Sequence, residues 1–289
     1  MRYNALISTL ARYKTESESL KQKSEELKLE DIASVNVHHP IIVSFMQKLY
    51  VSTIRTTEYY LYKAQRAYNY AALNYDNVIG AVLGDDPPFS RFDSTLLSAA
   101  HQNLSTSYNQ YLESRGPARG HFEKVQYPLD EWEHIPAITD AGTDSCTFFV
   151  TLVPGKGPGG GGPDPFAGMA NVRLLKARCY LQGATCTPSN LLHLTLTHYG
   201  TETLVDHTAR KYEFKHKGKI VSAFKYDLKT GAVRFDSTVG EDREDSGYAL
   251  VGPYVTWRVD VNERYNPGMD LSGVTGGYLE FDGYFRAVS

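Results

Sequence analysis

The chain has 289 residues, of which 42% are hydrophobic and 22% are charged, and its formal net charge is −3. This length is ample for a hydrophobic core and corresponds to one or two domains. The small negative charge excludes the broad basic field that attracts nucleic acid, so no nucleic-acid partner is expected.

The N-terminal region does not have the features of a membrane or export signal. No run of about 18 consecutive apolar residues occurs anywhere in the chain, so no transmembrane segment is expected. Residues 1–30 also lack an unbroken apolar stretch and a small-residue cleavage site, so no signal peptide is predicted. The compartment stays open, because a cytosolic protein and a piece of a longer processed, secreted or surface chain are both compatible with this start.

Three successive segments carry apolar and tyrosine residues at alternating spacings of three and four. The repeat runs through Tyr3, Leu6, Leu10, Tyr13, Leu20 and Leu27, then Tyr50, Ile54, Thr57, Leu61, Ala64, Tyr68, Ala71, Tyr75 and Val78, then Leu97, Ala100, Leu104, Tyr108 and Tyr111. A stripe of this period needs another helix packed alongside at a shallow angle. Residues 1–125 are therefore predicted to form an antiparallel bundle or coiled coil of long helices, or a helical stalk.

From about residue 143 the pattern changes to short alternating runs separated by turn residues. The runs are 147–153, 172–181, 191–198, 211–216, 220–227, 232–236, 254–261 and 277–287. About eight strands with no helical pattern between them favour an antiparallel β-sandwich of the jelly-roll type. We therefore expect an α+β fold with a helical domain at 1–125 and a sandwich domain at 143–289.

The stretch 155–163 (GKGPGGGGP) contains the spacing G-x-G-x-x-G, which suggests a dinucleotide site. That motif requires a helix to begin at its end, so that backbone N–H groups face the pyrophosphate. Here prolines surround the glycines and the next run is another strand. The stretch is therefore predicted to be a flexible loop, and no cofactor is expected.

Cysteine and histidine give no metal-ligand pattern. Cys146, Cys179 and Cys186 do not form a CxxC pair. Cys179 and Cys186 are compatible with a disulfide across the turn at 183, but the favoured interpretation is that the cysteines are small, buried, apolar side chains on strands. His193 and His198 have an odd spacing on one strand, which places them on opposite faces, so no metal site is predicted.

A catalytic constellation is also missing from the sequence. No G-x-S-x-G motif occurs, and no cysteine is placed at a helix N-terminus that would activate it. A sandwich-fold hydrolase stays an alternative, because such an enzyme needs only two converging carboxylates. The candidates are Asp206, Glu213, Asp227, Asp236, Asp260, Asp270, Glu280 and Asp282.

Aromatic composition is the most distinctive feature, with 21 tyrosines against 12 phenylalanines and two tryptophans. Tyrosine combines a large apolar face with a hydroxyl group and is favoured at interfaces. The second helical segment has tyrosines on more than one face, so they either meet a partner or pack against the sandwich. The candidate interface residues are Tyr59, Tyr60, Tyr62 and Tyr70.

A second aromatic group lies in the β part. Tyr254, Trp257 and Tyr265 are candidates for stacking on a sugar ring. Trp257 also fits the pattern of a core residue in such a strand. A glycan-binding, lectin-like sandwich is therefore the first alternative function.

Long heptad helices followed by NVRLLKARCYL and GPYVTWRVDVN…LSGVTGGYLEFDGYF resemble the C-terminal region of Tc-type toxin A subunits. In that family, helices of a stalk lead into a β-rich domain that binds a partner subunit. The resemblance implies a component of a larger toxin-like or structural complex. It supplies no catalytic, ligand or metal residue, so the leading interpretation is a non-catalytic module for protein interaction, assembly or self-association.

Overall fold

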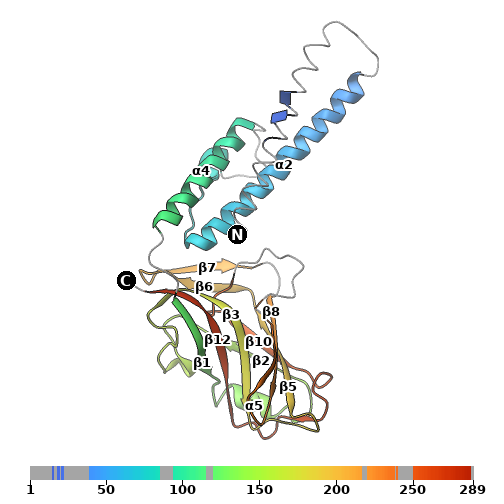
Figure 1. Ribbon diagram of the computed structural model, residues 1–289, viewed down its shortest axis with the longest axis vertical. Helices are drawn as coiled ribbons and strands as arrows, with labels where there is room; N and C mark the ends of the chain where they lie inside the picture. The colour runs from blue at the N-terminus through green and yellow to red at the C-terminus, as the bar shows by residue number, and fades with distance from the viewer. Residues whose placement is uncertain are drawn as a thin grey trace. The chain divides into compact units, whose positions relative to one another are not determined.

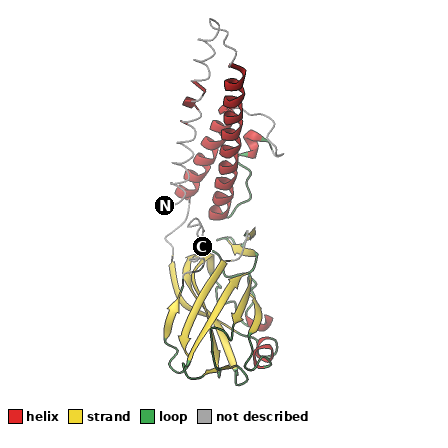
Figure 2. Cartoon of the chain, turned by 90° about the vertical axis from the view of Figure 1, so that its right-hand side faces the viewer, coloured by secondary structure: helices red, strands yellow, loops and turns green. Residues whose placement is uncertain are grey.

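The computed structural model describes residues 39–84, 94–114, 120–216, 220–237 and 250–287, together with positions 15, 18, 19, 21, 22 and 239. Apart from those isolated positions, the first heptad segment lies outside the described residues. Contacts divide the chain into two compact units, Met1–Arg115 and Gly116–Ser289. The described long helices belong to the first unit and the strands to the second (Figure 2), which confirms the α+β class.

The first unit contains a long helix α2 (His39–Ala72), a short helix α3 (Gly80–Leu83) and a helix α4 (Ser94–Ser114). None of the described helices is both long enough and apolar enough to span a bilayer. The heptad positions of α2 and α4 face each other and form one small core. Its buried members are Ile54, Leu61, Ala64, Tyr68, Ile79, Leu97, Ala100 and Leu104.

The two long helices run in the same direction, whereas the sequence predicts antiparallel neighbours (Figure 1). Near the end of both helices, the hydroxyl of Tyr111 donates to the carbonyl of Ala71 at 2.8 Å. The rings of Tyr68 and Tyr111 pack edge to face there, with centroids 6.4 Å apart. The parallel arrangement is possible because the connection across residues 73–93 is long enough to return the chain to the start of its neighbour. A short loop would have forced antiparallel packing.

The heptad pattern continues to residue 78, but α2 ends at Ala72. The next residue, Leu73, has a φ of 53°, which is left-handed and stops the helix. The side chain of Gln65 binds the segment that follows the helix. Its oxygen accepts a hydrogen bond from the Ile79 amide at 2.7 Å. Its nitrogen donates to Asn77 at 2.8 Å. Asparagine and glutamine side chains thus fix a turn that apolar periodicity alone does not reveal.

The second unit is built from antiparallel strands in two larger sheets and two small two-stranded sheets (Figure 1). The three-stranded sheet has the order β1 (Gly120–Pro128), β12 (Gly276–Ala287), β3 (Met169–Gln182). The five-stranded sheet has the order β2 (Cys146–Thr151), β10 (Thr256–Val261), β5 (Leu191–His198), β8 (Ile220–Asp227), β9 (Val233–Asp236). The small pairs are β4 (Thr185–Cys186) with β11 (Met269–Asp270) and β6 (Thr201–Val205) with β7 (Lys211–Lys215), and one short helix, α5 (His134–Thr139), follows β1.

Strand β1 begins inside the region that the sequence assigns to helices. Its register against β12 shifts between Phe122 and Val125, and Lys124 in the bulge has a φ of 57°. The Asp282 carboxylate accepts from the Lys124 amide at 2.8 Å and so satisfies the backbone at the bulge. The bulge breaks the strict alternation of buried and exposed side chains that would have indicated a strand.

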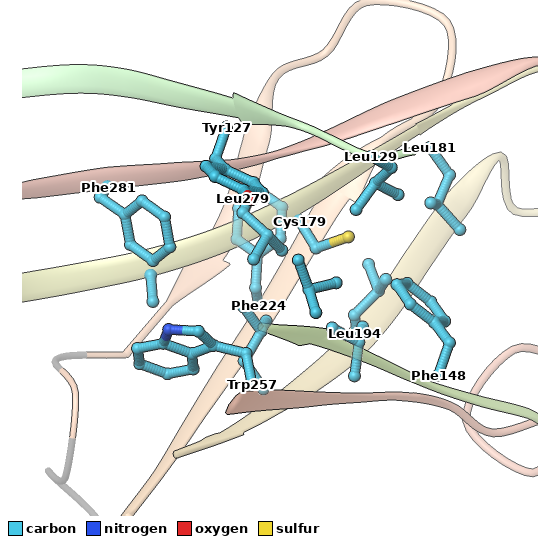
Figure 3. Packing of buried hydrophobic residues seen from close by; sticks show 14 of the residues in the cluster. Tyr127, Leu129, Phe148, Cys179, Leu181, Leu194, Phe224, Trp257, Leu279 and Phe281 are labelled. Carbon is cyan, nitrogen blue, oxygen red and sulfur yellow. The ribbon is translucent and has the colours of Figure 1, made fainter. Parts of the chain in front are cut away.

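Both larger sheets contribute to a single hydrophobic core (Figure 3). Cys179, Leu279 and Phe281 enter it from the three-stranded sheet, while Phe224 and Trp257 enter from the five-stranded sheet. The rings of Trp257 and Phe281 lie 5.8 Å apart. Apolar positions repeat with a period of two along these strands, so one face of each sheet is buried in the shared core.

All three cysteines are buried and free. The structure therefore has no disulfide between Cys179 and Cys186, and the apolar interpretation of these residues applies. Burial raises the pKa of the Cys179 thiol well above its ordinary value. Such a protonated thiol is unreactive.

The glycine-rich stretch forms a closed loop between β2 and β3, with a turn of 3₁₀ helix, η1 (Pro158–Gly160). The Gly157 amide donates to the carbonyl of Gly162 at 3.0 Å. Asp164 joins the end of the loop to its start, because its Oδ2 accepts from the Gly155 amide at 2.7 Å and from the Tyr254 hydroxyl at 2.9 Å. The loop is followed by the strand β3, as the alternating pattern of residues 172–181 predicts.

Candidate functional site

The three candidate sugar-stacking residues do not form one exposed platform. Trp257 is fully buried and its indole nitrogen donates to the Pro253 carbonyl at 3.0 Å, so no face is open to a sugar. Tyr254 is 6% exposed and its hydroxyl is bound to Asp164. Tyr265 is 61% exposed and lies against His193. The structure thus corrects the stacking role of Trp257 and Tyr254, because both rings are core residues.

The tyrosines predicted as an interface on α2 differ in their exposure. Tyr59 and Tyr62 are 55% and 50% exposed, Tyr60 is half-buried, and Tyr70 is buried. Lys63 lies over the ring of Tyr59, with its nitrogen 4.5 Å from the centroid. Tyr70 is therefore unavailable to a partner, whereas Tyr59 and Tyr62 are accessible.

Five charged side chains gather between the edges of the two sheets. Arg178 of β3 donates to Asp236 at 2.9 Å, to Glu280 at 2.8 Å and to Asp282 at 2.5 Å. Lys176 also binds Asp236, at 2.9 Å. Of the eight carboxylates considered for hydrolysis, these three converge, but all of them are engaged by one guanidinium group.

Hydrogen bonds to carboxylates keep the Arg178 side chain charged despite its burial. Burial alone would lower the pKa of Arg178, but its hydrogen bonds to Asp282, Asp236 and Glu280 raise that pKa above its ordinary value. All three carboxylates are therefore partners of one charged guanidinium group. The arrangement is that of an ion-pair network rather than an acid–base pair.

A second group of polar side chains lies where β5, β6 and β7 meet. His198 is the last residue of β5, Glu202 lies on β6, and His216 directly follows β7. The His216 Nε2 and Glu202 Oε1 atoms are 2.8 Å apart, and the His198 Nε2 and Glu202 Oε2 atoms are 3.4 Å apart. Among the described residues, these three form the group of histidine, cysteine or acidic side chains whose ligand atoms all lie within 4.8 Å of one another.

Burial makes this histidine–glutamate group chemically unusual. His198 and Glu202 have no exposed surface, and the side chain of His216 is 12% exposed. The Gly252 amide donates to Glu202 Oε2 at 2.5 Å, which fixes the orientation of the carboxylate. Burial alone would raise the pKa of Glu202, but His198 and His216 beside it, with Arg173 nearby, hold that pKa well below its ordinary value.

His198 is the unsatisfied member of the group. Neither of its ring nitrogens has a hydrogen-bond partner among the described residues. Its ring instead contacts Trp257 and His216 edge to face, each with a centroid separation of 5.4 Å. A buried polar atom without a partner is uncommon and calls for an explanation in each case.

This group is not evident from the sequence, because the spacing of His198 and His193 on one strand says nothing of residues on other strands. Those two lie on opposite faces of β5, where His193 is half-buried and His198 is on the core side. The partner residues come from the next hairpin, β6 and β7, and β6 was not predicted. The sequence feature that could have indicated the group is the pair His198 and Glu202, four residues apart on either side of the turn at Gly200.

Comparison with known proteins finds a distant resemblance to a solved structure. No protein-family model and no curated protein sequence matches the chain. The cryo-EM structure of Yersinia pseudotuberculosis TcaA-TcaB shows a distant fold resemblance, with a TM-score of 0.48 and 11% sequence identity. The match covers 93% of this chain, which spans 15% of the length of that chain.

Proposed function

We propose that the protein is a non-catalytic protein-interaction and assembly module that self-associates through α2. The observation that carries this proposal is an exposed stripe on the side of α2 away from its core. Phe45 is 64% exposed, Leu49 is 39% exposed and Tyr59 is 55% exposed. Their spacing of four and then ten residues keeps them on one helical face.

The middle of this stripe is suited to close contact between helices. Ser52 and Thr56 are exposed and separate Leu49 from Tyr59. The hydroxyl of Thr56 donates to the carbonyl of Ser52 at 2.9 Å, within the same helix. Its polar atom is therefore already satisfied, so covering this face leaves it with a partner.

The order of side chains along the stripe favours a second copy of the chain as the partner. An antiparallel, two-fold pairing centred on Ser52 places Phe45 of one copy opposite Tyr59 of the other. Such an interface uses the same patch twice, as closed dimers do. In this register the basic residues Lys48 and Arg55 face Thr56 and Leu49 and do not face each other.

The β unit supplies the other half of the module. We take its two larger sheets, which share one core, as the faces of a β-sandwich of the jelly-roll type. Its polar clusters are internal, so the assembly contacts we propose lie on the helical unit. The function then depends on surface complementarity and not on a reacting group.

The solution mass of the intact protein, measured by light scattering over a range of concentrations, tests this proposal. We expect a concentration-dependent mass above the 32.3 kDa of one chain. The double variant Phe45→Ser/Tyr59→Ser should shift the mass towards a monomer. Tyr62→Ser is the matched control, because Tyr62 is 50% exposed on the same helix but lies off the stripe.

Ionic strength provides a second criterion. α2 carries four basic residues and one acidic residue between positions 39 and 72, so two copies repel each other electrostatically. Added salt should therefore strengthen association. A protein that stays monomeric at every concentration and salt level, or a double variant that associates like the wild type, overturns the proposal.

A further inference from the structure

We propose that His198, Glu202 and His216 bind a divalent transition-metal ion, with zinc as the ion whose ligand preferences fit best. This proposal does not depend on self-association, since all three ligands come from the β unit. It concerns the group described above at the junction of β5, β6 and β7.

The donor set has the chemistry of a zinc site. Zinc in proteins binds imidazole nitrogen and carboxylate oxygen at about 2.0 to 2.2 Å, which places tetrahedral ligand atoms about 3.3 Å apart. The His198 Nε2 atom is 3.4 Å from Glu202 Oε2, and the His216 Nε2 atom is 2.8 Å from the other carboxylate oxygen, Glu202 Oε1. All three ligand atoms lie within 4.8 Å of one another, so small side-chain rotations bring them to one ion.

The state of His198 is the independent observation that points to a ligand. A buried imidazole with no hydrogen bond at either nitrogen costs free energy that folding must offset. Coordination of an ion by one of those nitrogens removes this cost. A purely structural histidine in the same place would be expected to have at least one bonded nitrogen.

A hydrogen-bonded network without metal explains only part of the group. Glu202 already accepts from the Gly252 amide at Oε2 and lies 2.8 Å from His216 at Oε1. His198 lies within ion-pair distance of Glu202 but is not aligned for a hydrogen bond. The aligned hydrogen bonds of Glu202 therefore come from Gly252 and His216, whereas His198 contributes only a 3.4 Å contact and keeps both ring nitrogens without an aligned partner.

The surroundings indicate how the site would behave. Gly252 holds the carboxylate in place, as outer residues of metal sites do. A Cβ atom at position 252 would lie 2.4 Å from Leu204 and 3.3 Å from the Glu202 carboxylate, so glycine permits this approach. His216 is the partly exposed ligand and marks the side from which an ion enters.

Three protein ligands leave a fourth coordination position for water or another ligand. Arg173 is close enough to act on the Glu202 charge, and its positive charge opposes a second cation. The site should therefore bind less tightly than a four-ligand structural zinc site. The ion is expected to stabilise the folded β unit, because the unfolded chain does not hold the three ligands together.

The first experiment uses the intact wild-type protein after treatment with a chelator and removal of that chelator. Titration with Co²⁺, which takes the place of zinc and has visible absorption bands, should saturate at one ion per chain with the spectrum of a four-coordinate site. Added Zn²⁺ should displace the cobalt and abolish the spectrum. At about 100 times its dissociation constant, Zn²⁺ should raise the melting temperature by about 5 to 10 °C.

Variants separate this site from adventitious binding by surface histidines. His216→Ala removes the most exposed ligand and is the variant least expected to disturb folding. It should lose the cobalt spectrum and the thermal shift. His193→Gln is the matched control, since it alters a half-buried histidine of the same strand on the other face, and it should keep both.

The proposal fails if the wild-type protein gives no four-coordinate cobalt spectrum and no thermal shift with zinc. It also fails if His216→Ala, folded as judged by circular dichroism, binds like the wild type. Loss of both signals in His193→Gln but not in His216→Ala would place the ion elsewhere. A monomeric protein that binds one ion would overturn the proposed function and leave the metal site intact.

Discussion

The β unit contains two buried clusters of polar side chains, and they differ in how their charges and polar atoms are paired. Around Arg178, the guanidinium group binds three carboxylates at 2.5 to 2.9 Å, so each charge has an opposite partner. Around Glu202, one carboxylate faces two histidines, and His198 has no hydrogen bond. Ion pairs compensate the charges of the first cluster, where Asp236 Oδ1 is the atom without a hydrogen bond, whereas in the second cluster both ring nitrogens of His198 have none.

The Arg178 cluster has a clear structural role because it joins the two larger sheets. Arg178 and Glu280 lie on neighbouring strands of the three-stranded sheet, and Asp236 is the last residue of β9 in the five-stranded sheet. Their contacts therefore connect the edges of the two sheets outside the apolar core. Removal of the central cation would leave three carboxylates facing one another.

The largest expected effect comes from Arg178→Met, which preserves the length of the side chain but removes its charge. Breaking a buried network by removing one partner costs about 3 to 5 kcal/mol. Urea denaturation should show this loss in the free energy of unfolding. Lys176→Met is the control, because Lys176 contacts the same Asp236 but is 34% exposed, and a partly exposed pair contributes about 1 kcal/mol or less. Equal losses of stability for the two variants would contradict the central role of Arg178 in its cluster.

An intermediate effect is expected for His198→Leu, and it should depend on added metal. In the presence of a chelator, this variant should lose about 1 kcal/mol or less, because it removes only the unaligned 3.4 Å contact between His198 and Glu202. With Zn²⁺ added, the wild type should gain stability and the variant should not. Thermal unfolding with and without Zn²⁺ measures both. A large loss in chelator would show that His198 has a partner in the folded protein.

The smallest effect concerns Tyr180, whose ring lies beside the Arg178 cluster. Burial, and next the Glu280 carboxylate, raises the pKa of Tyr180 from 10.0 to about 12. Between these two pH values the unfolded state loses the phenol proton and the folded state keeps it. The free energy of unfolding therefore falls as the pH rises from 10 to 12. Tyr180→Phe should show a shallower fall in denaturation measured across this window, and a slope equal to that of the wild type would exclude this assignment.

Regular elements were predictable where the alternation is unbroken. The runs 191–198 and 220–227 coincide with β5 and β8, because Leu192, Leu194 and Leu196 all point to one core. β1 was not predicted, because the bulge at Lys124 interrupts its period. The predicted antiparallel direction was wrong for α2 and α4, since periodicity reports the face of a helix and not the path of the chain that joins two of them.

The site could be predicted only in part, because its residues meet through tertiary structure. Trp257 has the same strand pattern whether its ring is buried or exposed, and only the packing against Phe281 decides between them. His198, Glu202 and His216 come together through two successive turns. A periodicity analysis of single strands does not bring them together.

The order of strands in the three-stranded sheet has a consequence for the time at which the β unit can fold. β12 lies between β1 and β3, and Gly120 of β1 pairs with Phe285. On the ribosome, both outer strands emerge long before the strand that joins them. Until then each exposes unpaired backbone groups on an apolar strand, a state that is prone to aggregation. The three-stranded sheet can therefore form only after residues 276–287 have left the ribosome, and a chain that lacks them leaves β1 and β3 without their shared partner strand.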